Sequence, residues 1–352
     1  MPRRGACVFA LLVVVVGCRR SSPLESPSDG ARAPDDGATT IDRTASLLGG
    51  ERGIDHVGIA VRDLETTTRT YHDVLGFDRP SEGRLPNGLR NVNYYFADGT
   101  YLETVVHWDR EKAAWLAAFT DHHSGALFGV LSAFSPAATT VFLARRGVKV
   151  GAPFAGTLQT ASDTTMPGER WKTFFLPDGQ LPGDPLYFIA YPRAARDDFL
   201  GKLKDRGVRR GFYHQNTALG LAAIWVAVAN LDVATRAYEA IGLVRGRVFS
   251  DPRLGALGQG FVAGGGEIWL LAPTSPYTKT AAFLRERGGP GIVGVTLLVG
   301  SVPEAARQLA SRTGRAFPAY EGPLGNSILV PPELTHGVWM EFAQYLVPPA
   351  TR

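Results

Sequence analysis

His56 is the residue of this chain whose type and setting best indicate chemistry. It carries an acid–base and metal-binding side chain near the start of an alternating apolar run, Ile54–Leu64. Alternate side chains of a β-strand share a face, so His56 lies on the same face as Gly58, Ala60 and Arg62. The opposite, aliphatic face must pack beneath a helix, whereas the two small residues leave room for a ligand beside the histidine. The run therefore predicts a site on the open face of a strand.

The elements that must position His56 follow directly along the chain. A helix is predicted over Leu64–Leu75, because Asp63 stands at an N-cap position and Gly76 at the C′ position. Two strands come next, joined by a turn. On the second of them, alternation groups four side chains on one face: Tyr101, Glu103, Val105 and His107.

This strand–helix–strand–strand–strand order is predicted four times. The units open at Ile54–Val61, Ala126–Leu131, Ala223–Val228 and Val293–Val299, and the third opening repeats the first without its histidine. A repeat of this kind is typical of folds that are built from one supersecondary unit. Because the chain is also too long for one typical core, we expect an α+β fold. In it, four βαβββ units form two domains, each with helices outside a curved mixed sheet and a concave face inside.

The first residues are typical of an export signal. Ala6–Val16 is an apolar run of 11 residues, too short to span a bilayer and suited to a signal-peptide core. It ends in Val15–Cys18, which resembles the bacterial lipobox; the alternative is an ordinary signal peptide with a chance cysteine. We predict a signal peptide over 1–17, lipid attachment at Cys18 and a flexible tether over 18–52. The protein would then be lipid-anchored and extracytoplasmic in the bacterial cell envelope, on the periplasmic side or the surface.

Composition excludes several classes of function. Hydrophobic residues make up 45% of the chain, charged residues 20%, and the net charge is only +4. The body contains no stripe of basic residues interleaved with aromatic ones, so nucleic-acid binding is not expected. Cys7 and Cys18 are the two cysteines of the sequence. Since the first is removed with the signal and the second takes the lipid, the mature domains have no disulfide, thiolate nucleophile or cysteine-bound zinc.

Several of these segments resemble the glyoxalase, bleomycin-resistance and dioxygenase superfamily, also called vicinal oxygen chelate. They are Ile54–Leu64, Tyr71–Phe77 and Gly99–Glu103, and the segments Asn87–Tyr94 and Asp184–Tyr191 are similar to its glyoxalase-like branch. The resemblance implies that paired βαβββ units form a half-barrel cleft, with metal ligands on the first and fourth strands of each unit. It places two glyoxalase-like domains over 53–195 and 221–352, joined by a charged connection over 196–220.

The resemblance also implies a pair of metal ligands, His56 and Glu103. An imidazole and a carboxylate suit divalent Fe, Mn, Zn or Ni. The matching positions of the second unit fall near Ala126 and Ala190, which have no donor atoms. The alternative is that His56 and Glu103 form a hydrogen-bonded polar pair that contacts an organic ligand.

Three further histidines lie off the family positions and are candidates for a third ligand: His107, His122 and His123. In an enzyme of this family, Glu103 would be the catalytic carboxylate. The cleft around it would be lined by Gly58, Ala60 and Tyr101.

The second domain lacks most of a ligand set. The four positions that the resemblance identifies there hold Ala223, Leu270, Gly294 and Glu341, and Trp225 would point to the concave face. Two missing histidines exclude a ring-cleaving dioxygenase. The stretch His214–Ala218 resembles a His-Pro-Asn-Gly-Ala segment of this branch, and it would either cap a turn or reach into the first cleft.

Two functions remain. The first is a binding protein that holds a small, planar or carbonyl-bearing molecule in the cleft of the first domain. The second is a metal-dependent lyase, isomerase or epimerase in which a divalent ion at His56 and Glu103 polarises substrate oxygens. Glutathione-dependent glyoxalase activity is disfavoured, because an exported protein is separated from the cytosolic glutathione pool.

Overall fold

The computed structural model describes residues 47–49, 53–78, 81–158, 168–177, 179–183, 186–192 and 214–345. These residues all belong to one compact unit, Thr39–Arg352. The predicted signal peptide, Cys18 and residues 196–213 of the predicted connection lie outside them. Among the described helices, none is long and apolar enough to cross a membrane.

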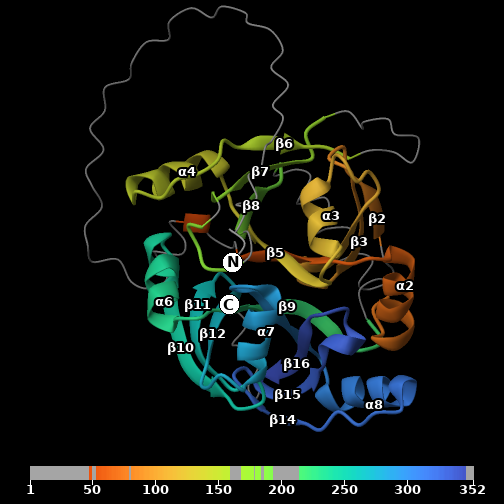
Figure 1. The fold of residues 1–352 in the computed structure, drawn as a ribbon. Helices are drawn as coiled ribbons and strands as arrows, with labels where there is room; N and C mark the ends of the chain where they lie inside the picture. The colour runs from red at the N-terminus through yellow and green to blue at the C-terminus, as the bar shows by residue number, and fades with distance from the viewer. Residues whose placement is uncertain are drawn as a thin grey trace, which may run out of the picture. The chain divides into compact units, whose positions relative to one another are not determined.

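Eight strands form the first sheet, and its two halves meet where β1 pairs antiparallel with β5. Within the first half, β1 pairs parallel with β4. The order across the sheet is β2-β3-β4-β1-β5-β8-β7-β6 (Figure 1). The bounds are β1 Ile54–Ala60, β2 Ser81–Arg84, β3 Leu89–Tyr95, β4 Tyr101–His107, β5 Gly125–Ser132, β6 Phe154–Gly156, β7 Trp171–Phe175 and β8 Leu186–Ala190.

The second sheet repeats this order, β10-β11-β12-β9-β13-β16-β15-β14. Its bounds are β9 Ala218–Ala227, β10 Val244–Asp251, β11 Ala256–Ala263, β12 Gly266–Pro273, β13 Gly291–Val299, β14 Tyr320–Gly322, β15 Gly325–Val330 and β16 Trp339–Tyr345. The predicted α+β fold of four repeated units in two curled half-barrels is therefore confirmed.

A side-chain cap begins each described α-helix except α3, Ala114–Thr120. The bounds of the others are α2 Leu64–Arg69, α4 Pro136–Arg145, α6 Leu231–Ala240, α7 Lys279–Arg287 and α8 Val302–Thr313, with a short 3-10 helix at Pro332–Leu334. Asp63 caps α2 by accepting from the backbone amides of Glu65 and Thr66. The predicted single helix Leu64–Leu75 is interrupted, because its second half, Thr70–Val74, is a π-turn. It ends at Gly76, whose φ of +78° favours glycine.

One apolar core underlies both sheets. Val57, Ile59 and Val61 are fully buried, as the alternation of the first strand predicts. They belong to the same cluster as Ile224 and Val295 of the second sheet. Leu47 and Leu48, near the end of the predicted tether, also belong to it: Leu48 accepts a backbone hydrogen bond from Phe134, at 2.6 Å, and Leu47 accepts one from the Thr139 hydroxyl of α4, at 2.8 Å.

A second cluster lies on the opposite, concave face of the first sheet. Helix α3, which the sequence analysis did not predict, contacts β1 and β4. Its Leu116 packs with Ala60, Val105 and Phe128. Part of the concave face is therefore occupied by protein.

Candidate functional site

A β-bulge at the start of β1 assembles the most unusual polar group of the first sheet. Ile54 pairs with Leu131 and His56 with Val130, so Asp55 is an extra residue in the pairing. A bulge bends the strand and re-aims its side chains. The side chains of two consecutive residues consequently meet, with Asp55 Oδ1 2.7 Å from His56 Nδ1. Asp55 was not predicted as a site residue, because strict alternation places neighbours on opposite faces.

The other imidazole nitrogen of His56 faces Glu103. The distance from His56 Nε2 to Glu103 Oε2 is 3.3 Å, and the two side chains are 7% and 9% exposed. Asn91 of β3 donates to Glu103 Oε1 at 2.5 Å. The structure thus brings together the two residues that the sequence singled out, and it adds Asp55 and Asn91 as partners that orient them.

These carboxylates determine the protonation state of His56. Burial by itself lowers the pKa of an imidazole and is the largest single effect, but hydrogen bonds and charges from Asp55 and Glu103 outweigh it and raise the pKa to about 9. At neutral pH, His56 is therefore an imidazolium ion between two carboxylates.

Tyrosine side chains surround this charged group. The ring of Tyr101 stacks on the imidazole of His56, with 4.3 Å between the ring centroids. The ring of Tyr95 contacts that of Tyr101, with 4.8 Å between the centroids. Tyr191 donates to Asp55 Oδ1 at 3.2 Å. Burial raises the pKa of Tyr95 to about 12 and those of Tyr101 and Tyr191 well above their ordinary value, so all three phenols stay protonated at neutral pH.

Of the residues predicted to line the cleft, only Tyr101 contacts His56 in this way. A Cβ atom on Gly58 would lie 2.0 Å from the ring of Phe128, so the space in front of this glycine is filled. Ala60 is fully buried in the cluster that includes Leu116 of α3. The prediction that the two small residues leave room for a ligand is therefore wrong: they make room for Phe128 and α3.

The prediction that a further histidine joins His56 and Glu103 as a third metal ligand is also wrong. The described residues contain no group of three or more His, Cys, Asp or Glu side chains that could hold a metal ion. His107 lies four residues beyond Glu103 on β4, about 13 Å along an extended strand. It lines a hollow of about 360 Å³ with Arg62, Thr120 and Asp121. His122 and His123 follow α3, next to Gly125, which pairs with Ala60 at the far end of β1.

The strand register identifies which residues of the second unit correspond to the pair. In the first unit, Gly58 lies two residues after His56 and pairs with Glu103. In the second unit, Val130 lies two residues after Phe128 and pairs with Tyr187. Where the two halves meet, Gly58 pairs with Phe128 and Val130 pairs with His56. The counterparts of His56 and Glu103 are therefore Phe128 and Tyr187, and the predicted positions near Ala126 and Ala190 are wrong. Ala126 belongs to the core on the other face.

The donor set on the concave face determines whether a divalent ion fits there. The concave face supplies His56 and Glu103, while Phe128 occupies one of the corresponding positions and has no donor atom. Tyr187 occupies the other, and its ring stacks on Phe128 at 5.2 Å. Catalytic metal centres usually have three protein ligands. The described residues do not fit such a centre.

The corresponding face of the second sheet is filled. Trp225 pairs with Trp269, so the register position predicted for Leu270 belongs to Trp269, and the two indole rings stack at 5.6 Å. Glu341 is fully buried and accepts hydrogen bonds from Thr296 at 2.8 Å and Tyr320 at 2.6 Å. Burial raises its pKa. Of the four corresponding positions of the second sheet, only that of Glu341 thus holds a carboxylate, and its oxygens are already hydrogen-bonded.

His214 and Asn216 are structural. His214 Nδ1 accepts from the amide of Asp78 at 2.9 Å, and His214 Nε2 donates to the carbonyl of Tyr95 at 3.0 Å. Asn216 donates to the carbonyl of Leu75 at 2.7 Å. This stretch therefore fastens the start of β9 to the first half-barrel and does not reach the His56 cluster.

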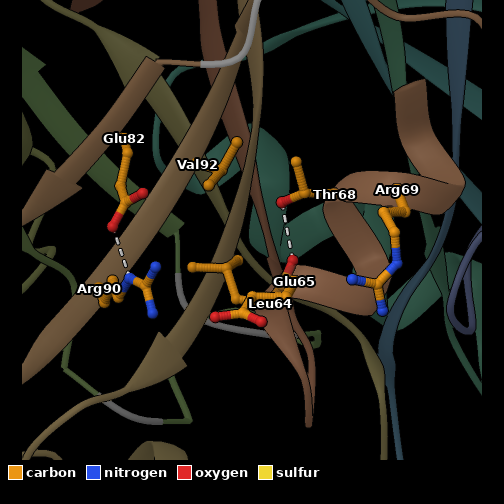
Figure 2. Close-up of a pocket in the computed structure, with 7 residues that line it drawn as sticks. All are labelled: Leu64, Glu65, Thr68, Arg69, Glu82, Arg90 and Val92. Carbon is orange, nitrogen blue, oxygen red and sulfur yellow. Dashed lines mark hydrogen bonds and ion pairs between the residues drawn. The ribbon is translucent and has the colours of Figure 1, made fainter. Parts of the chain in front are cut away.

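A groove of about 290 Å³ lies between α2 and the strands β2 and β3, and Figure 2 shows the side chains that line it. It is lined by Leu64, Glu65, Thr68, Arg69, Glu82, Arg90 and Val92. Leu64 and Val92 belong to the core on the helix side of the sheet. The groove therefore opens on the face opposite His56 and is separate from the candidate site.

Comparison with known proteins defines the class. A family model described as "Glyoxalase-like domain" matches residues 54–242, from β1 into the helix that follows β9. The chain therefore belongs to the glyoxalase-like domain family. A comparison with curated proteins gave no match.

Three solved structures illustrate the likeness. A mutant of 4-hydroxymandelate synthase from Streptomyces coelicolor is 14% identical, with a TM-score of 0.57 over 86% of this chain and 95% of that one. A hypothetical protein from Staphylococcus aureus is 13% identical, with a TM-score of 0.52 over 83% and 98%. Methylmalonyl-CoA epimerase from Mycobacterium tuberculosis is 25% identical, covering 37% of this chain and 91% of its own, with a TM-score of 0.34. The first two show the fold alone.

Proposed function

We propose that this protein is a cell-envelope lipoprotein whose first glyoxalase-like domain binds a small planar organic molecule at the His56 cluster. The observation that carries the proposal is the combination of a buried, charged group with aromatic ring faces around it. Ligand sites are typically apolar surfaces with a few fixed polar groups. The stacked Tyr101 and the adjoining Tyr95 and Tyr191 provide such a surface beside Asp55 and Glu103.

The charges of the cluster favour a particular ligand chemistry. Two carboxylate side chains flank one imidazolium, so the formal charges of the group sum to an excess of one negative charge. A ligand with a positive charge or hydrogen-bond donors would reduce that excess, and its ring would stack on tyrosine faces. We therefore infer a planar molecule that carries a cationic or donor group.

A fluorescence titration with proflavine, a planar aromatic cation, tests the proposal. Glu103→Gln removes the carboxylate in question, and Glu341→Gln is the matched control, because it removes a buried carboxylate on a strand of the second sheet, away from the His56 cluster. We expect saturable binding to the parent and to the control, and at least tenfold weaker binding to Glu103→Gln. Absence of binding to the parent, or equal binding by all three proteins, would overturn the proposal.

A second candidate is a divalent-metal-dependent lyase, isomerase or epimerase that uses His56 and Glu103. One observation favours it: His56 Nε2 and Glu103 Oε2 face each other at 3.3 Å. Asp55 and Asn91 hydrogen-bond to the other polar atoms of these two side chains, His56 Nδ1 and Glu103 Oε1, as the partners of metal ligands usually do. The ion would have to displace the proton of His56, so its binding would strengthen as the pH rises. Stoichiometric Zn, Mn, Ni or Fe in the purified parent, lost in His56→Ala, would favour this candidate over the first.

The lipid anchor has its own test. Cys18 is the proposed attachment site, and it precedes the described residues. Replacing it with serine should move the protein from the membrane fraction to the soluble fraction. Unchanged labelling by a palmitate analogue in Cys18→Ser would contradict this part of the proposal.

A further inference from the structure

Helix α4 has an exposed surface that is apolar, where most surface helices are polar. Phe134, just before the helix, is 63% exposed and Val141 is 51% exposed. Ala137, Ala138 and Ala144 are exposed as well. Within the helix, Ala137, Val141 and Ala144 recur at helical spacing, so they form one stripe on the outer side of α4, and Phe134 lies just before its first residue. The buried side of the same helix is formed by Thr139 and Leu143.

The other described helices on this side of the sheets present charged residues outward. Exposed positions include Glu65 and Arg69 on α2, Arg236 on α6 and Arg307 on α8. The α4 stripe is therefore a local feature and does not follow from its position in the fold.

The charged residues in the stretch of sequence around α4 are all basic. Arg145 and Lys149 are exposed at the end of α4, and no acidic residue occurs between 122 and 162. Arg146 is not part of this group, because it donates to the carbonyls of Glu239 and Ala240. An apolar stripe with basic residues at its margin is the pattern by which helices lie in the interface of an anionic bilayer.

The chain also enters the fold at this helix. Leu47 and Leu48 hydrogen-bond to Thr139 and Phe134, on either side of the first turn of α4. Residues 19–46, 28 in number, separate this point from Cys18. Such a length spans at most about 100 Å. A lipid at Cys18 would therefore keep the element that carries the stripe within about 100 Å of the bilayer.

From these observations we propose that α4 is a membrane-docking surface, in which Phe134, Val141 and Ala144 insert among lipid head groups and Arg145 and Lys149 contact anionic ones. Figure 1 shows α4 at the edge of the fold, outside the sheets. The lipid anchor would supply the attachment, and α4 would determine the orientation of the protein on the surface.

Flotation with vesicles tests this surface independently of lipidation. The full chain carrying Cys18→Ser is mixed with vesicles of phosphatidylglycerol and phosphatidylethanolamine in a ratio of 1:3, or of phosphatidylcholine alone. We expect binding to the anionic vesicles only. The double variant Val141→Asp, Ala144→Asp should reduce it at least tenfold, and Arg145→Glu with Lys149→Glu should abolish the preference for anionic lipid.

Val233→Asp is the matched control, because Val233 is 52% exposed on α6 and Val141 is 51% exposed on α4. It should leave flotation unchanged, and circular dichroism melting should show that all variants are folded. Equal flotation of the Val141 and Val233 variants would overturn the proposal. A loss of dimerisation in the Val141 variant without a loss of flotation would assign the stripe to a second copy of the chain and would also overturn it.

Discussion

The raised pKa of His56 makes a quantitative prediction about stability and pH. The folded-state value is about 9, against an ordinary value of 6.5. Because the protonated form is favoured in the folded protein, the stabilisation is fully present below pH 6.5 and is lost as the pH rises through 9. A shift of this size corresponds to about 3 kcal/mol, and the side chains involved are too buried for solvent to screen it strongly.

The assay is urea unfolding of the parent and of His56→Gln at several pH values between 6 and 10. Groups common to both proteins cancel in the difference between their free energies of unfolding. We expect that difference to shrink by about 3 kcal/mol from pH 6 to pH 10, with most of the change above pH 7. A difference that stays constant with pH would refute the conclusion that His56 is an imidazolium in the folded protein.

Two further substitutions test the packing around the site. Gly58→Ala should cost about 1–3 kcal/mol of stability, because its methyl group meets the ring of Phe128; Phe128→Leu should recover part of that loss in a double-mutant cycle, and simple additivity would contradict the contact. His214→Ala should cost about 1–3 kcal/mol in urea unfolding, since it leaves the amide of Asp78 and the carbonyl of Tyr95 without their partner; an unchanged midpoint would show that this junction does not contribute.

The fold was predictable because the alternation of apolar residues and the residues that mark helix ends indicate the same elements along the chain. Val57, Ile59 and Val61 alternate with the opposite face, and Asp63 and Gly76 mark the ends of a helical segment. The same pattern recurs in each unit, so the repeat outweighed local errors. The π-turn within the first helical segment was missed, because it changes the hydrogen bonding without changing the composition.

The site was predictable only in part. His56 and Glu103 could be placed on one face from the alternation, but Asp55 could not, since a bulge is a departure from that alternation. A second bulge separates Ala126 from Phe128, because Gly58 pairs with Phe128 and Ile59 with Ala126. The assignment of Leu270 was displaced by one residue from Trp269, and a shift of one residue moves a side chain to the other face of a sheet. For His107 a signal was present, because four residues of extended chain already exceed the reach of a shared metal ion.

The sequence also contains a signal for the helix that covers part of the concave face. Ala and Leu, two strong helix formers, make up four of the seven residues of helix α3, and Leu116 is at the position that reaches Ala60 and Val105. Its short length concealed it among the strands. What composition does not reveal is which face a short helix covers, since that depends on the path of the chain between β4 and β5.

The most direct test of the central claim is the proflavine titration carried out in excess chelator, with the parent, Glu103→Gln and Glu341→Gln compared side by side. If the charged cluster binds its ligand through its own side chains, the dissociation constants of the parent and of Glu341→Gln will be the same with and without chelator, and Glu103→Gln will bind at least tenfold more weakly. Binding by the parent that disappears in chelator and returns with added Zn or Mn would contradict the claim.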